Sequence, residues 1–402
     1  PVIIAFLRYV AFIFSNCMRL SVFSGVSSSA VPVPVYFSYS FTSKVPGDMV
    51  PAFFSKAMIL FNCDYSEGAH ADILRRMAET NMEQTAGYGE DPYCDQARKL
   101  IAGLCGRTDL DIHFLIGGTQ TNFTVIAAAL RPHQCVLCAD TGHINVHESG
   151  AVEACGHKVS AIPSPDGKLT ARQIEEAWHA HWDDETREHM PQPRMVYISQ
   201  PTELGTIYSR KELQEISGVC RRRGLYLYMD GARLGYGLCD EDNDLDLPAI
   251  ASLCDAFYIG GTKVGALFGE ALVLRHEALK EDFRYIAKQK GGRLAKGRLL
   301  GIQFLELFRD GLYFRLGAHA DRLAVMLRDF CRSRGLSLPF SSGTNQQFVT
   351  MPDSVLEELG RKYGFAYLRR EDETHSTVRF CMSWATREED VRELMADIAR
   401  LC

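Results

Sequence analysis

A glycine-rich segment is the first place in the chain where residue types and spacing can do chemistry. Gly117, Gly118 and Thr119 follow the apolar run Ile112–Ile116, and a helical pattern begins at the same point. Two glycines let the backbone approach an anion, while the first turn of a helix offers free N–H groups and a positive dipole end. The segment therefore indicates a phosphate site, with a tight strand-to-helix turn as the alternative. It matches neither the G-x-G-x-x-G of dinucleotide-binding folds nor the G-K-[ST] of a Walker loop.

Two charged residues also stand just after apolar runs. Asp230 follows Leu225–Met229, and Lys263 follows Ala256–Ile259 and three small residues. A carboxylate at the end of a strand can hold a protonated ring nitrogen. A lysine in a desolvated pocket near another cation has a lowered pKa and acts as an amine nucleophile. Taken singly, Asp230 is equally well a turn cap and Lys263 a solvated loop lysine.

The combination of these segments indicates one cofactor. The glycine loop, Asp230 and Lys263 occur in this order, each at the end of an apolar run. Pyridoxal phosphate (PLP) needs the same three contacts, namely a phosphate site, a partner for its ring nitrogen and an amine for its aldehyde. We therefore expect a PLP site built from these residues.

The elements that must position these residues are visible as short apolar runs separated by helical patterns. Strands are predicted at Ile112–Ile116, Cys135–Cys138, Lys158–Ile162, Met195–Ser199, Leu225–Met229, Ala256–Ile259 and Ala271–Leu274. Helices are predicted at about Thr119–Leu130, Thr170–Trp182, Arg210–Arg222 and Leu247–Leu253. Strands separated by helices form βαβ units, so we expect an α/β fold with a mostly parallel sheet and helices on both faces. Ligands of such sheets bind beyond the carboxyl ends of the strands.

The pattern changes to long helices from about residue 279. The segments predicted there are helices at Gln303–Phe314, His319–Arg334 and Glu388–Leu401, and short runs at Phe348–Met351 and Val378–Ser383. We therefore expect a large PLP-binding domain over residues 58–278 and a smaller C-terminal α+β domain over residues 279–402. The start of the large domain, about 58–85, can pack on the small one.

Residues 1–57 do not resemble the rest of the chain. No acidic residue occurs from Pro1 to Gly47, and the apolar run Val2–Phe14 is too short, and interrupted by Arg8, for a membrane span. Acid-poor, Ser-rich segments with Arg are typical of targeting leaders. Upstream sequence without function is the alternative, because internal methionines offer later starts. We expect a cytoplasmic enzyme, with organellar targeting by residues 1–57 as the alternative.

Composition excludes several partners. The 402 residues carry 44 Lys+Arg and 50 Asp+Glu, a net charge of −6, and 46% are hydrophobic. This mildly acidic balance argues against nucleic acid or an anionic membrane as the main partner. The 13 cysteines are irregularly spaced, and the only C-x-x-C, Cys135–Cys138, has no second pair. Neither a disulfide framework nor a metal site is therefore expected.

The motifs resemble those of the threonine aldolase and β-eliminating lyase family. They are Asn62–His70 (NCDYSEGAH), Gly87–Pro92 (GYGEDP), Gly117–Asn122 (GGTQTN), His143–Ala151 (HINVHESGA), Asp230–Leu234 (DGARL) and Lys263. The similarity runs from about Asn62 to Ala385. It implies a PLP-dependent enzyme with the fold type I of aspartate aminotransferase.

The resemblance also implies roles for single residues. His143 stacks on the face of the PLP ring, and Arg233 bonds the cofactor's phenolic oxygen. Arg379, between apolar residues, grips the substrate carboxylate, for which a guanidinium fork is suited. Ser66 and Tyr88 match positions that line the active site. His147 and Glu148, next to this histidine, are interpreted as structural.

Two departures and one basic segment complete the comparison. Glu203 stands where many threonine aldolases carry a histidine, and Val264 follows Lys263 where relatives have Asn or a small residue. Glu203 is either the base for the substrate hydroxyl, its pKa raised by burial, or the sign of a different β-substituent. The segment Lys288–Arg298 resembles one that reaches across a subunit interface in the family, with Lys288, Arg293 and Lys296 as candidates and a solvated basic loop as the alternative.

The resemblance implies an aldolase that acts on β-hydroxy-α-amino acids. Threonine or allo-threonine would be cleaved to glycine and an aldehyde, with Lys263, His143 and Glu203 as catalytic residues. Such sites use residues of two subunits, so a homodimer or homotetramer is implied. β-Elimination or transamination by the same residues is the nearest alternative, and a catalytically silent relative is another.

Overall fold

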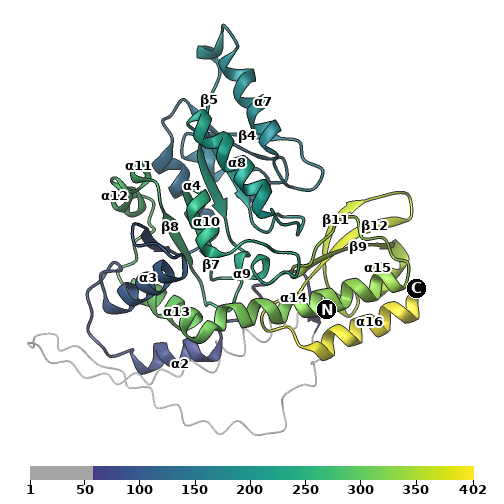
Figure 1. Ribbon diagram of the computed structural model, residues 1–402. Helices are drawn as coiled ribbons and strands as arrows, with labels where there is room; N and C mark the ends of the chain where they lie inside the picture. Colours follow the sequence, from purple (N-terminus) through teal and green to yellow (C-terminus); the bar gives the residue numbers. More distant parts are fainter. Residues whose placement is uncertain (1–57) are drawn as a thin grey trace, which may run out of the picture. The chain divides into compact units, whose positions relative to one another are not determined.

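A seven-stranded sheet organises the part of the chain that the structure describes. The structure is a computed structural model that describes residues 58–402, so the expectations for residues 1–57 lie outside the described residues (Figure 1). The strands lie in the order β2-β8-β7-β6-β5-β3-β4. Their bounds are β2 Asp111–Leu115, β3 Gln134–Ala139, β4 Lys158–Ile162, β5 Gln192–Ser199, β6 Tyr226–Asp230, β7 Ala256–Gly260 and β8 Glu270–Leu274.

The sheet is mostly parallel, as predicted, with one exception. The pairs β3–β4, β3–β5, β5–β6 and β6–β7 are parallel, whereas β8 runs antiparallel to both of its neighbours, β7 and β2. Only residues 261–269 connect β7 to β8. A link of this length is too short for a helical crossover, so the chain must return antiparallel. The same link carries Lys263, which therefore lies at the sheet edge where β7 ends.

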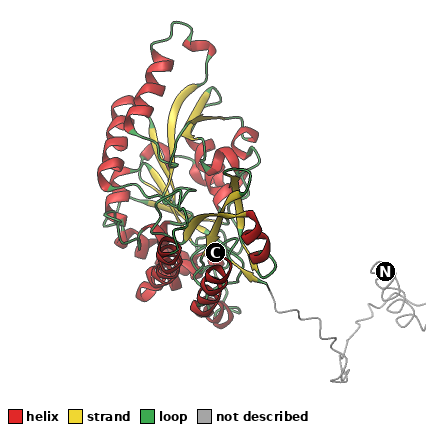
Figure 2. Cartoon of the chain, turned by 90° about the vertical axis from the view of Figure 1, so that its right-hand side faces the viewer, coloured by secondary structure: helices red, strands yellow, loops and turns green. Residues whose placement is uncertain are grey.

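Helices cover both faces of this sheet (Figure 2). The helices of the large α/β part are α4 Gly118–Ala129, α5 His143–Val146, α6 Ala151–Ala154, α7 Ala171–Trp182, α8 Arg210–Arg223, α9 Leu234–Gly237, α10 Leu247–Leu253, α11 Glu277–Lys280 and α12 Phe283–Gln289, with a 3₁₀ turn at Arg187–His189. Strand side chains alternate between the two cores: Leu227 and Met229 pack on one side, and Tyr226 and Tyr228 on the other.

Local sequence signals set the helix ends in this region. Helix α8 begins with a capping box, in which the side chains and backbone N–H groups of Ser209 and Glu212 bond reciprocally. It ends at Gly224, whose φ of 66° is left-handed and suits glycine. Thr170 and Gln173 form the same box at the start of α7. These signals are the reason that the predicted and observed helices nearly coincide here.

The C-terminal part forms a small domain around a second sheet. This three-stranded antiparallel sheet has the order β11-β12-β9. The elements of the C-terminal part are α13 Arg298–Phe308, α14 Leu312–Ser333, β9 Gln346–Pro352, α15 Asp353–Leu359, β10 Tyr363–Gly364, β11 Ala366–Arg370, β12 His375–Cys381 and α16 Glu388–Leu401, of which α13 packs on α2 and α3. In Figure 1, α14 runs from beside α13 to the β9–β12 sheet, so it links the two parts. The domain boundary at residues 278 and 279 stays a prediction.

Several sequence expectations need correction. The helix predicted over Gln303–Phe314 is wrong, because Asp310 has a φ of 56° and separates α13 from α14. Asp230 is the last residue of β6 and not the residue after it. Three elements near the start of the described chain were not predicted: β1 Ile59–Leu60, α2 Ala71–Glu79 and α3 Pro92–Leu104. Strand β1 pairs with β10 of the small domain, a long-range contact that no local pattern encodes.

We expect Gly231→Ala to destabilise the fold. A methyl group on Gly231 would overlap the carbonyl oxygen of Tyr258, because the chain directly after β6 passes close to the middle of β7. Overpacking of this kind costs about 1–3 kcal/mol or more in the free energy of unfolding. Gly103→Ala, in α3, is the matched control, since no atom lies within 4 Å of its added methyl. Thermal unfolding of both variants checks the prediction, and a wild-type melting temperature for Gly231→Ala would contradict it.

Candidate active site

A buried carboxylate lies at the carboxyl edge of the central sheet. Asp230, at the end of β6, is 4% exposed. Its Oδ1 accepts hydrogen bonds from the Tyr258 hydroxyl at 2.5 Å and the Ala232 N–H at 2.9 Å. Its Oδ2 accepts from the Tyr197 hydroxyl at 2.6 Å and from Asn122 Nδ2 at 2.9 Å. Strands β5 and β7 and helix α4 thus each contribute one donor to the last residue of β6.

The carboxylate of Asp230 is ionised without an ion pair. Burial acts to raise the pKa of Asp230, but His143 and the tyrosine hydroxyls outweigh burial, and the pKa lies below its ordinary value. Burial and the charge of Asp230 raise the pKa of Tyr197 and Tyr258 well above the ordinary value, so both hydroxyls donate. Across residues 58–402, no Lys, Arg or His lies within ion-pair distance of Asp230. A protonated ring nitrogen is the kind of partner that such a carboxylate fits.

Lys263 lies on the turn that follows β7. The Tyr236 hydroxyl holds the Lys263 carbonyl at 2.5 Å, and Lys263 Nζ lies 6.0 Å from the centre of the Tyr65 ring. Burial and the Arg233 guanidinium lower the pKa of Lys263, while Asp64 acts in the opposite direction. Its amine makes no hydrogen bond or ion pair with any other described residue. The side chain is therefore prepared to act as an amine nucleophile.

The glycine loop lies next to the same sheet edge. Gly117 is the N-cap of α4, and no side chain caps this helix, so the N–H groups of its first turn stay available. A Cβ on Gly118 would lie 3.0 Å from the Tyr258 hydroxyl, which explains the small residue there. Thr119 adds a hydroxyl in the first turn. This arrangement fits a phosphate group, so the loop, Asp230 and Lys263 together fit PLP.

Glu203, in the loop after β5, and His143, the first residue of α5, come together. The backbone N–H of His143 donates to Glu203 Oε1 at 2.9 Å, and the Ser199 hydroxyl donates to the same oxygen at 2.7 Å. Burial raises the pKa of Glu203. The imidazole Nδ1 of His143 lies 2.8 Å from Glu148 Oε1, and the ring centre lies 5.6 Å from that of His147.

Two arginines lie near the site, and they differ in how many of their N–H groups are already bonded. Arg233 makes a bidentate ion pair with Asp64, with distances of 2.7 and 3.0 Å. This pair holds the pKa of Asp64 at about 2 against the effect of burial. Arg379 donates to Gln346 Oε1 and to the Asn62 carbonyl, both at 3.0 Å. Its Nε is buried and makes no hydrogen bond to any residue that the structure describes.

Two acidic partners in this site, as well as Tyr197 and Tyr258, were not found from the sequence. Asp64 lies inside the Asn62–His70 motif, where a charged residue after an apolar run was the only available signal. Glu270, the first residue of β8, accepts hydrogen bonds from the Gly261 N–H at 3.1 Å and the Thr262 hydroxyl at 2.9 Å. It is buried behind the turn that carries Lys263, and burial raises its pKa to about 8. Only the antiparallel return of β8 brings it there.

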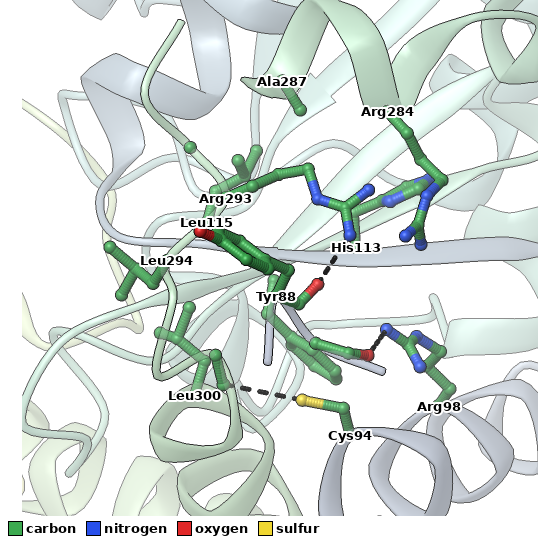
Figure 3. Close-up of a pocket in the computed structure, with 14 residues that line it drawn as sticks. Tyr88, Cys94, Arg98, His113, Leu115, Arg284, Ala287, Arg293, Leu294 and Leu300 are labelled. Carbon is green, nitrogen blue, oxygen red and sulfur yellow. Dashed lines mark hydrogen bonds between the residues drawn. The ribbon is translucent and has the colours of Figure 1, made fainter. Parts of the chain in front are cut away.

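Ser66 and Tyr88 are not joined to this group by any contact between the described residues. Ser66 is exposed, and its hydroxyl lies 3.2 Å from Cys63 Sγ. Tyr88 lines a separate pocket with Arg293 and neighbouring basic residues (Figure 3). Lys288 Nζ lies 4.4 Å from the centre of the Tyr88 ring. The segment Lys288–Arg298 thus contacts the turn around Tyr88, and it also touches α4, because Gln120 Nε2 donates to the Lys290 carbonyl at 3.1 Å.

Comparison with known proteins gives the family. The sequence profile of the β-eliminating lyases matches residues 63–354. The chain belongs to this family. A low-specificity L-threonine aldolase from a Pseudomonas species is 33% identical over 349 residues, which cover 84% of this chain and 96% of that enzyme.

Solved structures agree with this family assignment. The threonine aldolase of Leishmania major matches with a TM-score of 0.83 and 45% identity, covering 85% of this chain and 99% of that one. An aspartate aminotransferase variant from Thermus thermophilus matches with a TM-score of 0.63 and 15% identity, over 86% of this chain and 92% of that one, so it shares the fold alone. This lyase is PLP-dependent and has fold type I, as the motifs predicted.

The stability of the lyase should depend on pH through Glu270. The pKa of Glu270 is raised from 4.5 to about 8, so its contribution to the free energy of unfolding is complete below 4.5 and is lost as the pH rises through about 8. Glu270→Gln cannot titrate. We therefore expect it to lack this fall in the free energy of unfolding, which is on the order of a few kcal/mol. Chemical denaturation of both proteins across this window checks it, with exposed Glu357→Gln as control. Parallel curves for wild type and Glu270→Gln would contradict the assignment.

Proposed function

We propose that this lyase cleaves threonine and allo-threonine to glycine and acetaldehyde. The observation that carries the proposal is the shared sheet edge of Asp230, Lys263 and Glu203. Asp230 and Lys263 serve PLP chemistry of any kind. Glu203 adds a partly buried carboxylate held by the His143 backbone, and a carboxylate at this place could accept a hydroxyl proton. The relatives named threonine aldolases support the same substrate class.

The residues that would hold PLP are the ones that the sequence indicates. Gly117, Gly118 and Thr119 would bind its phosphate, Asp230 its ring nitrogen and Lys263 its aldehyde. When bound, PLP supplies an electron sink for the bond that breaks at the substrate Cα. His143 would face the ring, and Arg233, held in place by Asp64, would reach the phenolic oxygen.

Arg379 would bind the substrate carboxylate. Its two terminal nitrogens already bond to Gln346 and Asn62, which fixes the plane of the guanidinium. These two bonds use only two of the five N–H donors of the guanidinium, so a carboxylate could gain charge-assisted bonds from the others. Fixing the carboxylate orients the bond between Cα and Cβ. Ser66 would line the entrance near this arginine.

Glu203 would take the proton from the β-hydroxyl group. Ser199 and the His143 N–H both hold Oε1, whereas Oε2 makes no hydrogen bond to any residue between 58 and 402. Burial raises the pKa of Glu203, which makes it a stronger base than an exposed glutamate. The free Oε2 is therefore the atom that would accept the proton.

We also infer that a second copy of the chain completes the site, in a homodimer or homotetramer. Tyr88, which lines the pocket, and Tyr285, next in the chain to its lining residue Arg284, are both exposed large side chains. The basic residues Lys288, Arg293 and Lys296 would then face the partner's site. Among residues 58–402, no helix combines the length and apolar character that a membrane crossing needs. We propose a cytoplasmic enzyme, with import into an organelle through residues 1–57 as the alternative.

Product analysis tests the proposed reaction. The PLP-loaded protein mixed with L-threonine or L-allo-threonine should release glycine and trapped acetaldehyde in equal amounts, because only the bond between Cα and Cβ breaks. Lys263→Ala should lose the visible absorbance of bound PLP and at least about a thousandfold of the activity, since it lacks the amine nucleophile. Ammonia and a keto acid in place of glycine would overturn the aldolase assignment in favour of β-elimination.

Glu203→Gln should separate the two halves of the reaction. Threonine cleavage should fall about a hundredfold or more, because the amide cannot accept the hydroxyl proton. Exchange of the α-hydrogen of glycine with deuterium should persist, since glycine has no hydroxyl group. Acetaldehyde release and NMR of glycine in D₂O provide the two measurements. Equal losses in both reactions would show that Glu203 serves PLP binding or α-proton transfer instead.

A further inference from the structure

A buried chain of hydrogen bonds joins His143 to Asp230. The imidazole Nδ1 of His143 lies 2.8 Å from Glu148 Oε1. Asn122 Nδ2 donates to that same oxygen at 2.7 Å and to Asp230 Oδ2 at 2.9 Å. The side chain of Glu148 is 0% exposed and Asn122 is 0% exposed. The path runs from His143 on α5 to Glu148 in the loop after it. From there it continues through Asn122 on α4 to Asp230 at the end of β6.

The neighbouring groups determine which atoms donate and which accept in this chain of hydrogen bonds. The Tyr228 hydroxyl donates to Asn122 Oδ1 at 2.8 Å, so Nδ2 must be the atom that faces the two carboxylates. Each N–H of this amide then has one carboxylate acceptor. Glu148 Oε1 acts as an acceptor, so His143 Nδ1 carries a hydrogen and donates to it. Nε2 of His143 is therefore the ring nitrogen that does not bond to Glu148.

The backbone around Glu148 is shaped for this contact. Ser149 and Gly150 both have positive φ, 52° and 72°, directly after Glu148. A left-handed serine is unusual, so this turn is held by its surroundings. Glu148 Oε2 is buried and has no partner within the described chain. All the hydrogen bonds of this carboxylate are therefore made by Oε1. If Glu148 served only to fill space, an amide or an apolar side chain would do so without the free-energy cost of burying a charge.

We propose that Glu148 and Asn122 are positioning residues that set the orientation of His143 relative to Asp230. This inference rests on the proposed function, in which His143 faces the PLP ring and Asp230 holds its nitrogen. Asn122 fixes the separation between the two carboxylates, and Glu148 fixes the tautomer and plane of the imidazole. Neither residue needs to touch the substrate.

Isosteric substitutions test the proposal in the PLP-loaded enzyme. Glu148→Leu removes the acceptor and should lower kcat for threonine at least about tenfold, the loss seen when a carboxylate that orients a metal-binding histidine is removed. KM should stay within about twofold, because the contacts of Arg379 are unchanged. The circular dichroism of the bound-PLP band should change, since the ring meets His143 at a different angle. Glu148→Gln should restore most of both, because its amide oxygen can accept the same two hydrogen bonds.

A second variant and a control keep the test decisive. Asn122→Leu breaks the chain while leaving the contact between His143 and Glu148, and should also lower kcat and alter the PLP band. Glu306→Leu is the matched control, because Glu306 is another buried glutamate, paired with Arg76 and Arg309 on α13. It should leave kcat and the PLP band unchanged, whatever it does to the melting temperature.

The outcomes separate this proposal from the proposed function. Wild-type kcat and a wild-type PLP band in Glu148→Leu, or in Asn122→Leu if only that variant folds, would overturn the positioning role. A wild-type enzyme that binds PLP but releases no acetaldehyde would overturn the aldolase assignment alone. In that case the circular dichroism of the PLP band still decides the role of Glu148 and Asn122.

Discussion

The active site is organised around the buried charge of Asp230. A carboxylate in this position is costly unless hydrogen bonds or a cation stabilise it. The protein supplies hydrogen bonds from Tyr197 on β5, Tyr258 on β7 and Asn122 on α4. Four elements must therefore be in register before the charge is tolerated, and no Lys, Arg or His of the described residues forms an ion pair with it. The strand order places all of them at one edge of the sheet.

Acidic and basic side chains also lie close together at the same end of the sheet. Asp64 neutralises Arg233 through a bidentate pair, while Glu270 lies behind the turn of Lys263. Burial raises the pKa of Glu270 and lowers that of Lys263, so both groups tend toward their neutral forms. A neutral amine is the form that reacts with an aldehyde. Desolvation thus limits the net charge at this end of the sheet and favours the neutral form of the Lys263 amine.

Local patterns were sufficient for much of the fold. The strand Lys158–Ile162 and the helices Leu247–Leu253 and Glu388–Leu401 have the predicted bounds, because each has a strong periodicity or a clear cap. Residues 303–314 have the apolar pattern of one helix, and the break at Asp310 depends on a left-handed residue that the pattern does not mark. Strands β1 and β10 are two residues long and exist through their pairing with each other. Their stability is tertiary, so no window of sequence contains it.

The sequence by itself determined the family, the cofactor and the order of the glycine loop, Asp230 and Lys263. It did so because residue types at strand ends report chemistry, and the parallel sheet brings those ends together. Only the tertiary structure decided which neighbours hold them. Asp64, Glu270, Tyr197 and Tyr258 become partners of the site through strand pairing and packing over long sequence separations. The same holds for Asn122 and Glu148, whose hydrogen bonds span 108 and 26 residues along the chain. A hydrogen bond depends on distances in space, and spacing in sequence does not specify them.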